Sequence, residues 1–317
     1  MLTIAVAVIT YGRPQHLAKL AASLERLEGV DRHTLHFVIV DNDEAESARS
    51  VADTFTKKDA RFLYFCEPKK GIPVARNRGL DEALALGADI LCFVDDDEEV
   101  DPQWLAQLFA AYDDGAVQMT GGPVLVGPCL PSANRWQRFI HGSLVARSKR
   151  KAKKSAKDAL QKGKFTIVTN NWLADLEWLR ERKLRFDEEG FRYSGGSDTA
   201  FFRAFKAVGG KAVWNPKAVV YETVMADRLS LLYQMKRGRA QSANHFRMKR
   251  RAISIPLVLS TVGTAALRFV MGGLLLVLPI FGAASPVMAV RSIGWSVGRI
   301  DGLLGTRPAL YDKPQTN

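Results

Sequence analysis

Apolar runs and segments of helical periodicity alternate through the first hundred residues of the chain. The apolar runs are rich in β-branched or aromatic residues and predict strands at 2–10, 35–42, 61–66 and 88–94. Between them, helical spacing predicts helices at 13–27, 45–56 and 73–86. Strands that alternate with helices are typical of βαβ units, whose strands run parallel. The sequence therefore predicts an α/β fold built on a mostly parallel central sheet.

The second half of the chain is less regular. We expect a strand with a glycine bend at 116–127, a strand and helix at 165–183, then a helix capped near Ser197 and two short strands. With 317 residues and 47% hydrophobic content, the chain can form one large or two modest domains. We expect a catalytic domain at 1–240, and a basic linker with C-terminal membrane-associated helices at 241–317.

A dense run of acidic residues follows the fourth predicted strand, in CFVDDDEEVDPQW at 92–104. Asp95, Asp96 and Asp97 stand where an open α/β sheet presents ligands, at the carboxyl edge of its strands. Three adjacent carboxylates repel one another unless a cation neutralises them, and hard ions such as Mg²⁺ favour oxygen ligands together with substrate phosphates. The run thus predicts a metal site near a nucleotide, with a solvated loop as the alternative. Asp101 and Pro102 predict the start of the next helix.

Positive charge is concentrated in two stretches. The net charge is +12; residues 147–164 carry nine Lys or Arg and one Asp, and 235–251 carry seven basic residues and no acid. We expect the first stretch to form a flexible or surface helical insertion. Such local basicity indicates anionic partners, which include phosphates, an anionic membrane face and nucleic acid.

An apolar segment follows the second basic stretch. Residues 252–290 contain one charged residue, Arg268, and the 22 residues at 269–290 contain none. About 20 apolar residues cross a bilayer, so the segment predicts membrane attachment, with a buried pair of core helices as the alternative. The basic residues just before it favour the cytoplasmic side. We expect attachment to the cytoplasmic face of the bacterial inner membrane, through a hairpin that breaks near Arg268 in preference to one span.

Two further signals agree with a cytosolic catalytic part. Cys66, Cys92 and Cys129 are odd in number and show no metal-ligand spacing, which is typical of core residues in a reducing compartment. The apolar start at 2–9 lacks a basic region and a cleavage site, and predicts a strand instead of a signal peptide.

Seven short motifs, taken in order, carry a resemblance to a known family. They are VAVITYGRP, VIVDND, GIPVARNRGL, FVDDDEEVDPQWL, TNNWL, GGSDTAFFRA and VVYETV. This ordered set resembles the family 2 glycosyltransferases over residues 1 to about 240, and most of all the bacterial members that build exopolysaccharide or lipopolysaccharide, of the succinoglycan-assembly kind. The resemblance implies a GT-A fold, a nucleotide-sugar donor and inversion at the transferred sugar.

The resemblance assigns nucleotide contacts to residues at the ends of the first strands. Thr10, Tyr11 and Arg13 would line the nucleotide pocket, and Asp41 would accept a hydrogen bond from uracil or ribose. Arg76 matches the nucleotide-contacting arginine of the family, with Asn77 beside it. The structural alternatives are that Asp41 merely ends a strand and that Arg76 is a surface charge on a helix.

The resemblance also assigns the metal ligands and the base. Asp95 and Asp97 match the DxD positions and would hold Mn²⁺ or Mg²⁺, with Asp97 the more direct ligand and Asp96 near the ribose or sugar. Asp198 matches the catalytic aspartate, the one base that an inverting transfer needs to remove the acceptor hydroxyl proton. A helix N-cap formed by Ser197 and Asp198 is the structural alternative.

The sequence departs from the family pattern at three positions. Ser197 stands where the family commonly has Glu, and Glu222 stands where many relatives have a metal-ligating His; Glu222 could bind the metal or pair with Arg228. In QMKRGR, Gly238 replaces the Trp of the processive relatives, which favours addition of a single sugar. Gln234, Arg237 and Arg239 would close over the diphosphate, or form a solvated basic face.

These inferences together predict an inverting glycosyltransferase that moves a sugar from a UDP-sugar to a lipid-linked or polysaccharide acceptor at a membrane surface, without nucleic acid as a partner. A sugar-nucleotide nucleotidyltransferase would share the sheet and metal site, but its glycine-rich phosphate loop is missing from VITYGRP. A nucleic-acid-binding protein would explain the basic stretches but not Asp198 or the acidic run.

Overall fold

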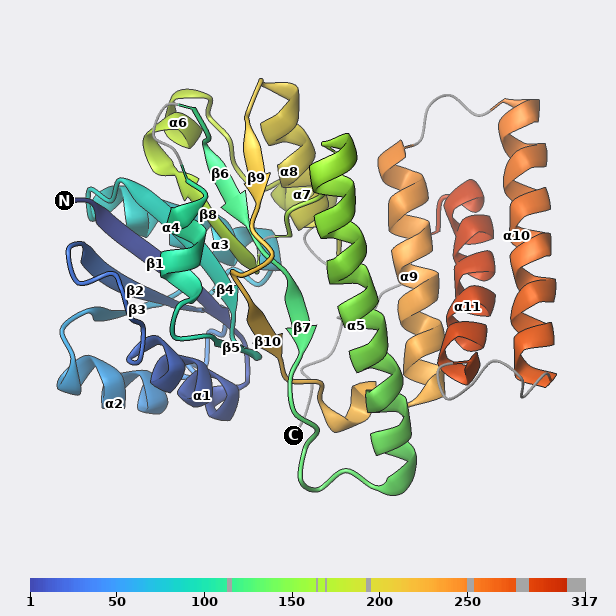
Figure 1. Cartoon of the computed structure of the whole chain (residues 1–317), viewed down its shortest axis with the longest axis horizontal. Helices are drawn as coiled ribbons and strands as arrows, with labels where there is room; N and C mark the ends of the chain where they lie inside the picture. The colour runs from blue at the N-terminus through green and yellow to red at the C-terminus, as the bar shows by residue number, and fades with distance from the viewer. Residues whose placement is uncertain are drawn as a thin grey trace.

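The computed structural model describes residues 1–112, 116–163, 165–168, 170–191, 195–249, 254–277 and 285–306. A sheet covered by helices occupies the N-terminal part, and three long helices stand side by side at the other end (Figure 1). The long helix α5, Arg135–Lys162, lies between these two parts.

The main sheet has seven strands in the order β3-β2-β1-β4-β8-β6-β9. Strands β3, β2, β1 and β4 pair parallel with one another, β8 is antiparallel to both β4 and β6, and β6 is parallel to β9. The prediction of an α/β fold with a mostly parallel sheet is therefore confirmed. The strands are β1 Thr3–Thr10, β2 Thr34–Asp41, β3 Phe62–Cys66, β4 Ile90–Asp95, β8 Asn171–Asp175, β6 Met119–Gly121 and β9 Ala212–Trp214.

Helices pack on both faces of this sheet because its inner strands are apolar on both sides. On β1, Ile4, Val6 and Val8 belong to one core cluster, while Ala5 and Ala7 belong to the other. The small side chain of Ala7 lets α3 approach, since a Cβ added at Gly79 would lie 3.1 Å from it. The helices are α1 Pro14–Leu24, α2 Arg49–Lys58, α3 Ile72–Ala85, α4 Trp104–Ala110, α6 Leu176–Glu181, α7 Glu188–Phe191 and α8 Ser197–Ala207.

A second sheet of three strands borders the acidic run. Its order is β5-β10-β7, with bounds Glu98–Val100, Val220–Glu222 and Val124–Val126. The single strand predicted at 116–127 is thus two strands in different sheets, β6 and β7. The chain turns between them at Gly122, where an added Cβ would lie 1.9 Å from the carbonyl oxygen of Ala218, so this position requires glycine.

The structure corrects two predictions about helices. The helix expected from Asp101 and Pro102 begins at Trp104, because Asp101 Oδ1 instead accepts from the Gln103 amide at 3.0 Å and forms a turn. The basic stretch 147–164 is not a separate insertion: as far as Gly163, it is the end of α5, which starts with a capping box at Asn134 and Gln137. Lys164 lies outside the described residues.

Three C-terminal helices form a layer of their own. They are α9 Leu231–Lys249, α10 Ile255–Val277 and α11 Ser285–Leu304, with α11 between the other two (Figure 1). Helix α9 is continuous across residue 240, so the boundary expected there lies inside a helix, and the division into two domains stays a prediction.

Helices α10 and α11 are antiparallel, because Arg268 stacks on Trp295 while Gly272 lies against Ala289 and Ile293. A hairpin was expected, but the break expected near Arg268 is wrong, since α10 continues through that residue. The residues that join the two helices, 278–284, lie outside the described ranges.

Candidate active site

Residues from the ends of β1 and β4 meet in a network of hydrogen bonds. Thr10 Oγ1 donates to Asp96 Oδ2 at 2.8 Å, and Arg13 Nη1 lies 3.2 Å from Asp96 Oδ1 and 3.3 Å from Asp97 Oδ2. The register of the parallel strands places Ile9 beside Asp95, so both strands end at the same edge. Three of the residues assigned to nucleotide binding, Thr10, Arg13 and Asp96, are therefore brought together as expected.

Asp97 is held by two guanidinium groups. Besides Arg13, Arg228 Nη1 lies 3.1 Å from Asp97 Oδ2 and 3.5 Å from Glu222 Oε1, which confirms the pairing of Glu222 with Arg228 considered from sequence. Arg228 belongs to the short 3-10 helix Ala226–Arg228, directly before α9. The Thr223 amide donates to the carbonyl of Asp97 at 2.7 Å, which ties β10 to the acidic run.

Asp95 has a more open environment than Asp97. Its side chain is 36% exposed against 9% for Asp97, and its only ion pair among the described residues is with Arg76 Nη2 at 3.5 Å. Burial of the carboxylate raises the pKa of Asp95 to about 6; Arg76 opposes the rise, and the charges of Asp97, Asp198 and Glu222 add to it. Burial, followed by the charge of Asp97, raises the pKa of Asp96 to about 7.

Glu98 is a buried carboxyl that sequence reasoning missed. It accepts from the Asp95 amide at 3.0 Å and from Asn170 Nδ2 at 2.6 Å, and burial raises its pKa well above the usual range. Its place in the acidic run was visible, but its burial depends on β5, whose partner β10 is more than a hundred residues away. Glu98 supports the loop that carries Asp95.

The residues fit a hard divalent cation by their chemistry. Asp95, Asp97 and Glu222 offer carboxylate oxygens, which are the ligands that such a cation prefers. The charges of Asp97 and Glu222 also add to the rise in the pKa of Asp95 that burial causes. Among the described residues, no three carboxylate, histidine or cysteine side chains already converge on one point. A bound ion would compete with Arg13 and Arg228 for the oxygens of Asp97.

Asp41, at the end of β2, is fully buried. Its Oδ2 accepts from the Ala48 amide at 2.8 Å and from Tyr64 Oη at 2.9 Å, whereas its Oδ1 has no partner among the described residues. Burial raises the pKa of this carboxyl. Tyr11 is near the loop after β3, because Lys70 Nζ donates to its hydroxyl at 3.2 Å.

Arg76 connects α3 to the start of α8. It is buried, and its Nη1 donates to Ser197 Oγ at 3.0 Å while its Nη2 pairs with Asp95. The view of Arg76 as a surface charge is therefore wrong. Asn77 fixes the same region by donating to the Phe186 carbonyl at 3.0 Å and to Glu188 Oε1 at 2.9 Å.

Asp198 lies in the first turn of α8, after Gly196 in a left-handed conformation (φ 113°). Gly196 is the N-cap residue, and no side chain caps the helix, so the N-cap alternative for Ser197 and Asp198 is not what the structure shows. Among the described residues, Asp198 Oδ1 accepts only a local bond, from the Thr199 amide at 2.8 Å, and the charge of Asp198 acts on both Asp95 and Lys151 of α5.

The basic element QMKRGR is directed mostly toward α11. Gln234 is buried and donates to the Arg228 carbonyl at 2.9 Å, and Arg239 pairs with Asp301 of α11 at 2.5 Å. Gly238 has a packing role here: a Cβ added there would lie 2.6 Å from the Arg291 carbonyl oxygen. A tryptophan at this position would displace α11.

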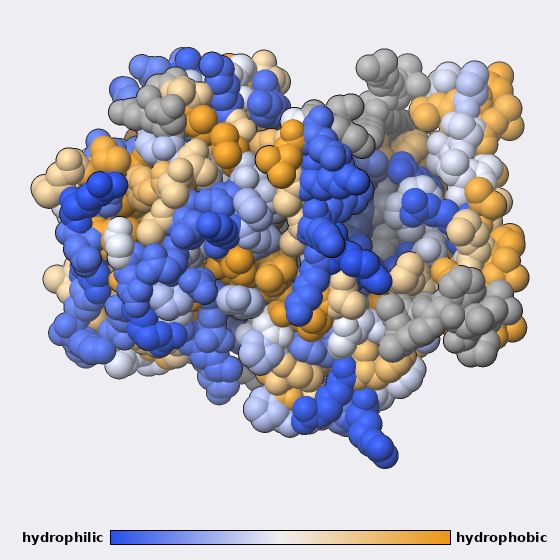
Figure 2. All heavy atoms as spheres, in the orientation of Figure 1, coloured by the Kyte–Doolittle hydropathy of each residue, from blue (hydrophilic) through white to orange (hydrophobic). Residues whose placement is uncertain are grey.

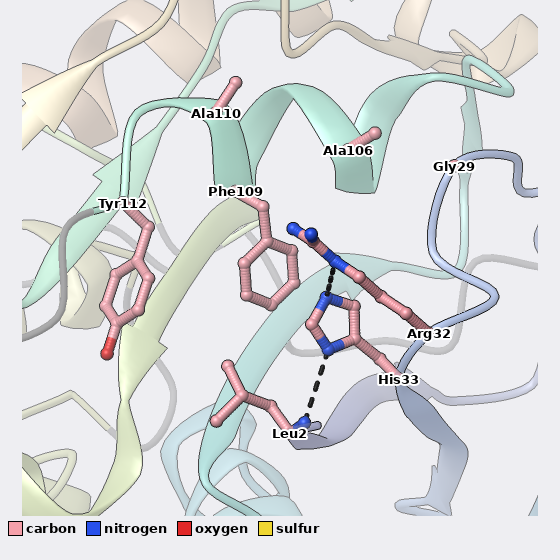
Figure 3. Close-up of a pocket in the computed structure, with 8 residues that line it drawn as sticks. All are labelled: Leu2, Gly29, Arg32, His33, Ala106, Phe109, Ala110 and Tyr112. Atoms are coloured by element: carbon pink, nitrogen blue, oxygen red, sulfur yellow. Dashed lines mark hydrogen bonds between the residues drawn. The ribbon is translucent and has the colours of Figure 1, made fainter.

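A pocket of about 440 Å³ lies at the opposite edge of the sheet, near the beginnings of β1 and β2 (Figure 3). The ring of His33 stacks on Phe109 there, with centroids 5.0 Å apart. None of the predicted site residues lines it; the lining residues are Leu2, Gly29, Arg32, His33, Ala106, Phe109, Ala110 and Tyr112.

Comparisons with known proteins agree with this geometry. Residues 5–182 match the family Glycosyl transferase family 2. The succinoglycan biosynthesis protein ExoM of Rhizobium meliloti (strain 1021) is 31% identical over 256 residues, which cover 78% of this chain and 75% of that protein. The GalNAc(5)-diNAcBac-PP-undecaprenol beta-1,3-glucosyltransferase of Campylobacter jejuni is 28% identical over 120 residues, 37% of each chain.

Among solved structures, the mannosyltransferase PcManGT from Pyrobaculum calidifontis, in complex with GDP-Man and Mn²⁺, has a TM-score of 0.63 and 16% identity over 95% of this chain and 87% of that chain. At that identity the likeness shows the fold alone. The family match favours the glycosyltransferase interpretation over the nucleotidyltransferase one. This chain therefore belongs to glycosyl transferase family 2, and its architecture is the GT-A fold.

Proposed function

We propose that this chain is an inverting glycosyltransferase that moves a sugar from a UDP-sugar to a lipid-linked or polysaccharide acceptor, with Mn²⁺ or Mg²⁺ held by Asp95 and Asp97. The observation that carries the proposal is the position of Asp198, whose charge acts on Asp95 across the site. Arg76 bridges Asp95 and the neighbouring Ser197, so the base and the acidic cluster are connected. A base and a cation-binding carboxylate pair are what a displacement from a nucleotide sugar requires.

In the proposed reaction, the Asp198 carboxylate accepts the proton of the acceptor hydroxyl while that oxygen forms a bond to the anomeric carbon. The bond from this carbon to the β-phosphate oxygen of UDP breaks on the opposite face, so the configuration inverts. A divalent cation supplies positive charge to the departing diphosphate when bound. Arg13 and Arg228 hold the side chain of Asp97 in position through their ion pairs.

We infer a uridine nucleotide from the carboxyl group of Asp41. The free Oδ1 of Asp41 is an acceptor suited to the imide N–H of uracil. Thr10, Tyr11 and Arg13, on the chain that leaves β1, would border the ribose and phosphates. The solved relative PcManGT holds GDP-Man and Mn²⁺, which supports a nucleotide sugar with a metal but not the choice of base.

The relatives support a role in exopolysaccharide or other cell-surface polysaccharide biosynthesis. ExoM is named for succinoglycan biosynthesis, and the Campylobacter enzyme is named for an acceptor linked to undecaprenol through a diphosphate. A lipid-linked acceptor resides at a membrane, so the enzyme must reach one.

We propose that α10 provides this contact, at the cytoplasmic face of the bacterial inner membrane. It is the one helix in the described ranges that is long and apolar enough to cross a bilayer. Its apolar side chains are exposed along the outer edge of the molecule (Figure 2): Ile255, Leu259, Val262, Leu267, Phe269, Val270, Met271, Leu274, Leu276 and Val277. Its one charged residue, Arg268, stacks on Trp295 of α11, with 4.0 Å between guanidinium and ring centroid.

A panel of UDP-sugars tests the donor assignment. Purified full-length protein should release UDP from one of them, with Mn²⁺ and not with a chelator present. A parallel GDP-sugar panel controls for the base, and release from GDP-sugars alone would contradict the role given to Asp41.

A further inference from the structure

Four basic side chains from three helices are near enough for their charges to act on one another. They are Arg147 and Lys151 of α5, Arg237 of α9 and Arg291 of α11, and we call them the basic cluster. The charges of Arg237 and Arg147 act on Arg291, and those of Arg147 and Arg237 act on Lys151. Burial, and then these neighbouring cations, lower the pKa of Arg291 to about 9.

The helices that carry the basic cluster are joined by apolar contacts nearer their N-terminal ends. Ile140 of α5, Leu229 before α9 and Val287 of α11 pack in one buried group. Arg147 follows Ile140 by seven residues, about 10 Å along the helix, and Arg291 follows Val287 by about 6 Å. These helices run in the same direction in Figure 1, so Arg147 and Arg291 both lie beyond this group along their helices.

Little negative charge compensates Arg147, Lys151 and Arg291 among the described residues. In the part of the chain that the structure describes, Arg147 and Lys151 form no ion pair within 4.0 Å. Arg291 donates to two neutral amides, Gln234 Oε1 at 2.6 Å and Gln241 Oε1 at 2.7 Å. The nearest carboxylates that act on the cluster are Asp198 and Glu222, at its Lys151 end.

The basic cluster lies between the proposed base and the membrane helix. Lys151 is near Asp198, while Arg291 belongs to α11, which packs directly on α10. Helix α5 presents a hydrophilic surface on the side of the molecule where these helices stand (Figure 2). An acceptor that has its reactive sugar at Asp198 and its hydrocarbon at α10 must therefore place its linking group here.

We propose that the basic cluster binds the diphosphate of an isoprenoid-diphosphate-linked acceptor, and so aligns the acceptor sugar with Asp198. The proposal rests on the proposed function. A diphosphate brings two or more negative charges, and it accepts the bidentate hydrogen bonds that guanidinium groups offer. The donor diphosphate is assigned separately, to the cation at Asp95 and Asp97, so the two anions occupy opposite sides of the base.

The test measures binding of farnesyl diphosphate to full-length protein saturated with UDP and Mn²⁺, by calorimetry. Arg147→Gln with Lys151→Gln should raise the Kd for farnesyl diphosphate on the order of 10- to 100-fold, because charged hydrogen bonds are lost. Farnesol should bind no differently to the variant and the wild type. The matched control is Lys149→Gln with Lys153→Gln, which removes the same charge at the same spacing from the other side of α5; it should leave the Kd within about threefold.

Three other outcomes would overturn the proposal. An equal loss in the control pair would show long-range attraction only. An equal loss of UDP affinity would assign the basic cluster to the donor. An equal loss of binding to phosphatidylglycerol vesicles, with farnesyl diphosphate unaffected, would assign it to lipid headgroups. If the wild type binds farnesyl diphosphate but never UDP, then the proposed function fails and the anion site stands.

Discussion

Asp198 differs from the other carboxylates of the site because no cation among the described residues forms an ion pair with it. Asp95 pairs with Arg76, and Asp97 pairs with two arginines. These ion pairs fix the two carboxylates in position, which suits them to bind a cation. Asp198 makes one local hydrogen bond within the described ranges, and its charge acts on Lys151. This difference separates the role of a base from that of a metal ligand.

Replacing Asp198 by Asn should lower the transfer rate at least about 100-fold, because a positioned general base contributes at least that much. The Kd for UDP with Mn²⁺ should change little, since the amide keeps the shape of the side chain. Rates come from acceptor-dependent UDP release, and Asp187→Asn, on the loop before α7, is the control. Retention of more than about a tenth of the rate would rule out general-base catalysis by Asp198.

Replacing Asp97 by Ala should make UDP binding insensitive to Mn²⁺. The change removes one of the two proposed ligands and leaves Arg13 and Arg228 without their shared partner. Titration of UDP with and without Mn²⁺ measures the effect. If Mn²⁺ still strengthens UDP binding in this variant, the metal is held elsewhere.

The pKa of Asp95, raised to about 6, predicts how metal binding depends on pH. A protonated carboxyl carries no charge for the cation, so Mn²⁺ should bind best above pH 7 and weaken as the pH falls through about 6. Titration of Mn²⁺ at several pH values checks this. The midpoint should shift toward lower pH in Asp198→Asn, because Asp198 contributes to the raised pKa.

At the scale of elements, glycines on α11 determine how closely it packs on α9. A Cβ added at Gly294 would lie 2.0 Å from the Met235 carbonyl oxygen, and one at Gly298 would lie 2.0 Å from that of Arg239. With Gly302 against Phe246, these residues form a small-residue stripe at four-residue spacing. The two backbones approach as closely as they do because no side chain separates them.

Gly298→Ala should therefore destabilise the protein by about 1–3 kcal/mol, the usual cost of forcing extra atoms into a packed interface. Gly263→Ala on α10 is the control: nothing lies within 4 Å of its added Cβ, and alanine favours a helix by up to about 1 kcal/mol over glycine. Thermal unfolding of both variants measures the difference. An unchanged melting temperature for Gly298→Ala would mean that α9 and α11 pack less closely than described.

The pattern of apolar residues along the sequence predicted those elements whose stabilising contacts are close in sequence or recur at a regular spacing. The strands β1 to β4 were found from their apolar runs, and the rule that ligands bind at the carboxyl edge singled out Asp95, Asp96 and Asp97. Thr10 and Arg13, which meet Asp96 in the structure, were assigned from the family resemblance. Strand β5 was missed because its residues are acidic and its pairing with β10 is non-local. The role of Gly238 was missed for the same reason: its partner, Arg291, is about fifty residues further on.

For the whole molecule, the arrangement of the three C-terminal helices restricts how α10 can enter a membrane. Helix α11 stands beside it, and the Arg239–Asp301 ion pair joins α11 to α9. If α10 crossed the bilayer in this arrangement, these charges would enter the hydrocarbon at considerable cost. We therefore expect α10 to lie along the interface, with its outer face among the acyl chains.

Val270→Glu with Leu274→Glu, on that outer face, should release the full-length protein from anionic vesicles. Burial of apolar area and attraction between basic residues and the lipid both favour binding, and each added carboxylate opposes both. Vesicle co-sedimentation at moderate salt measures the effect, and Val208→Glu, an exposed apolar residue at the end of α8, is the control. Wild-type protein that never sediments with vesicles would refute membrane contact through α10.

The glycine at 238 has a consequence for how such chains can diverge. Because a side chain there would collide with the backbone of α11, a bulky residue at 238 and the small residues at 294 and 298 exclude each other within one protein. In an alignment of homologues these positions should change together, and a lineage that acquires tryptophan at 238 should have lost or displaced the helix that we describe as α11. A homologue that keeps both would show that the two helices can separate during evolution without loss of the enzyme.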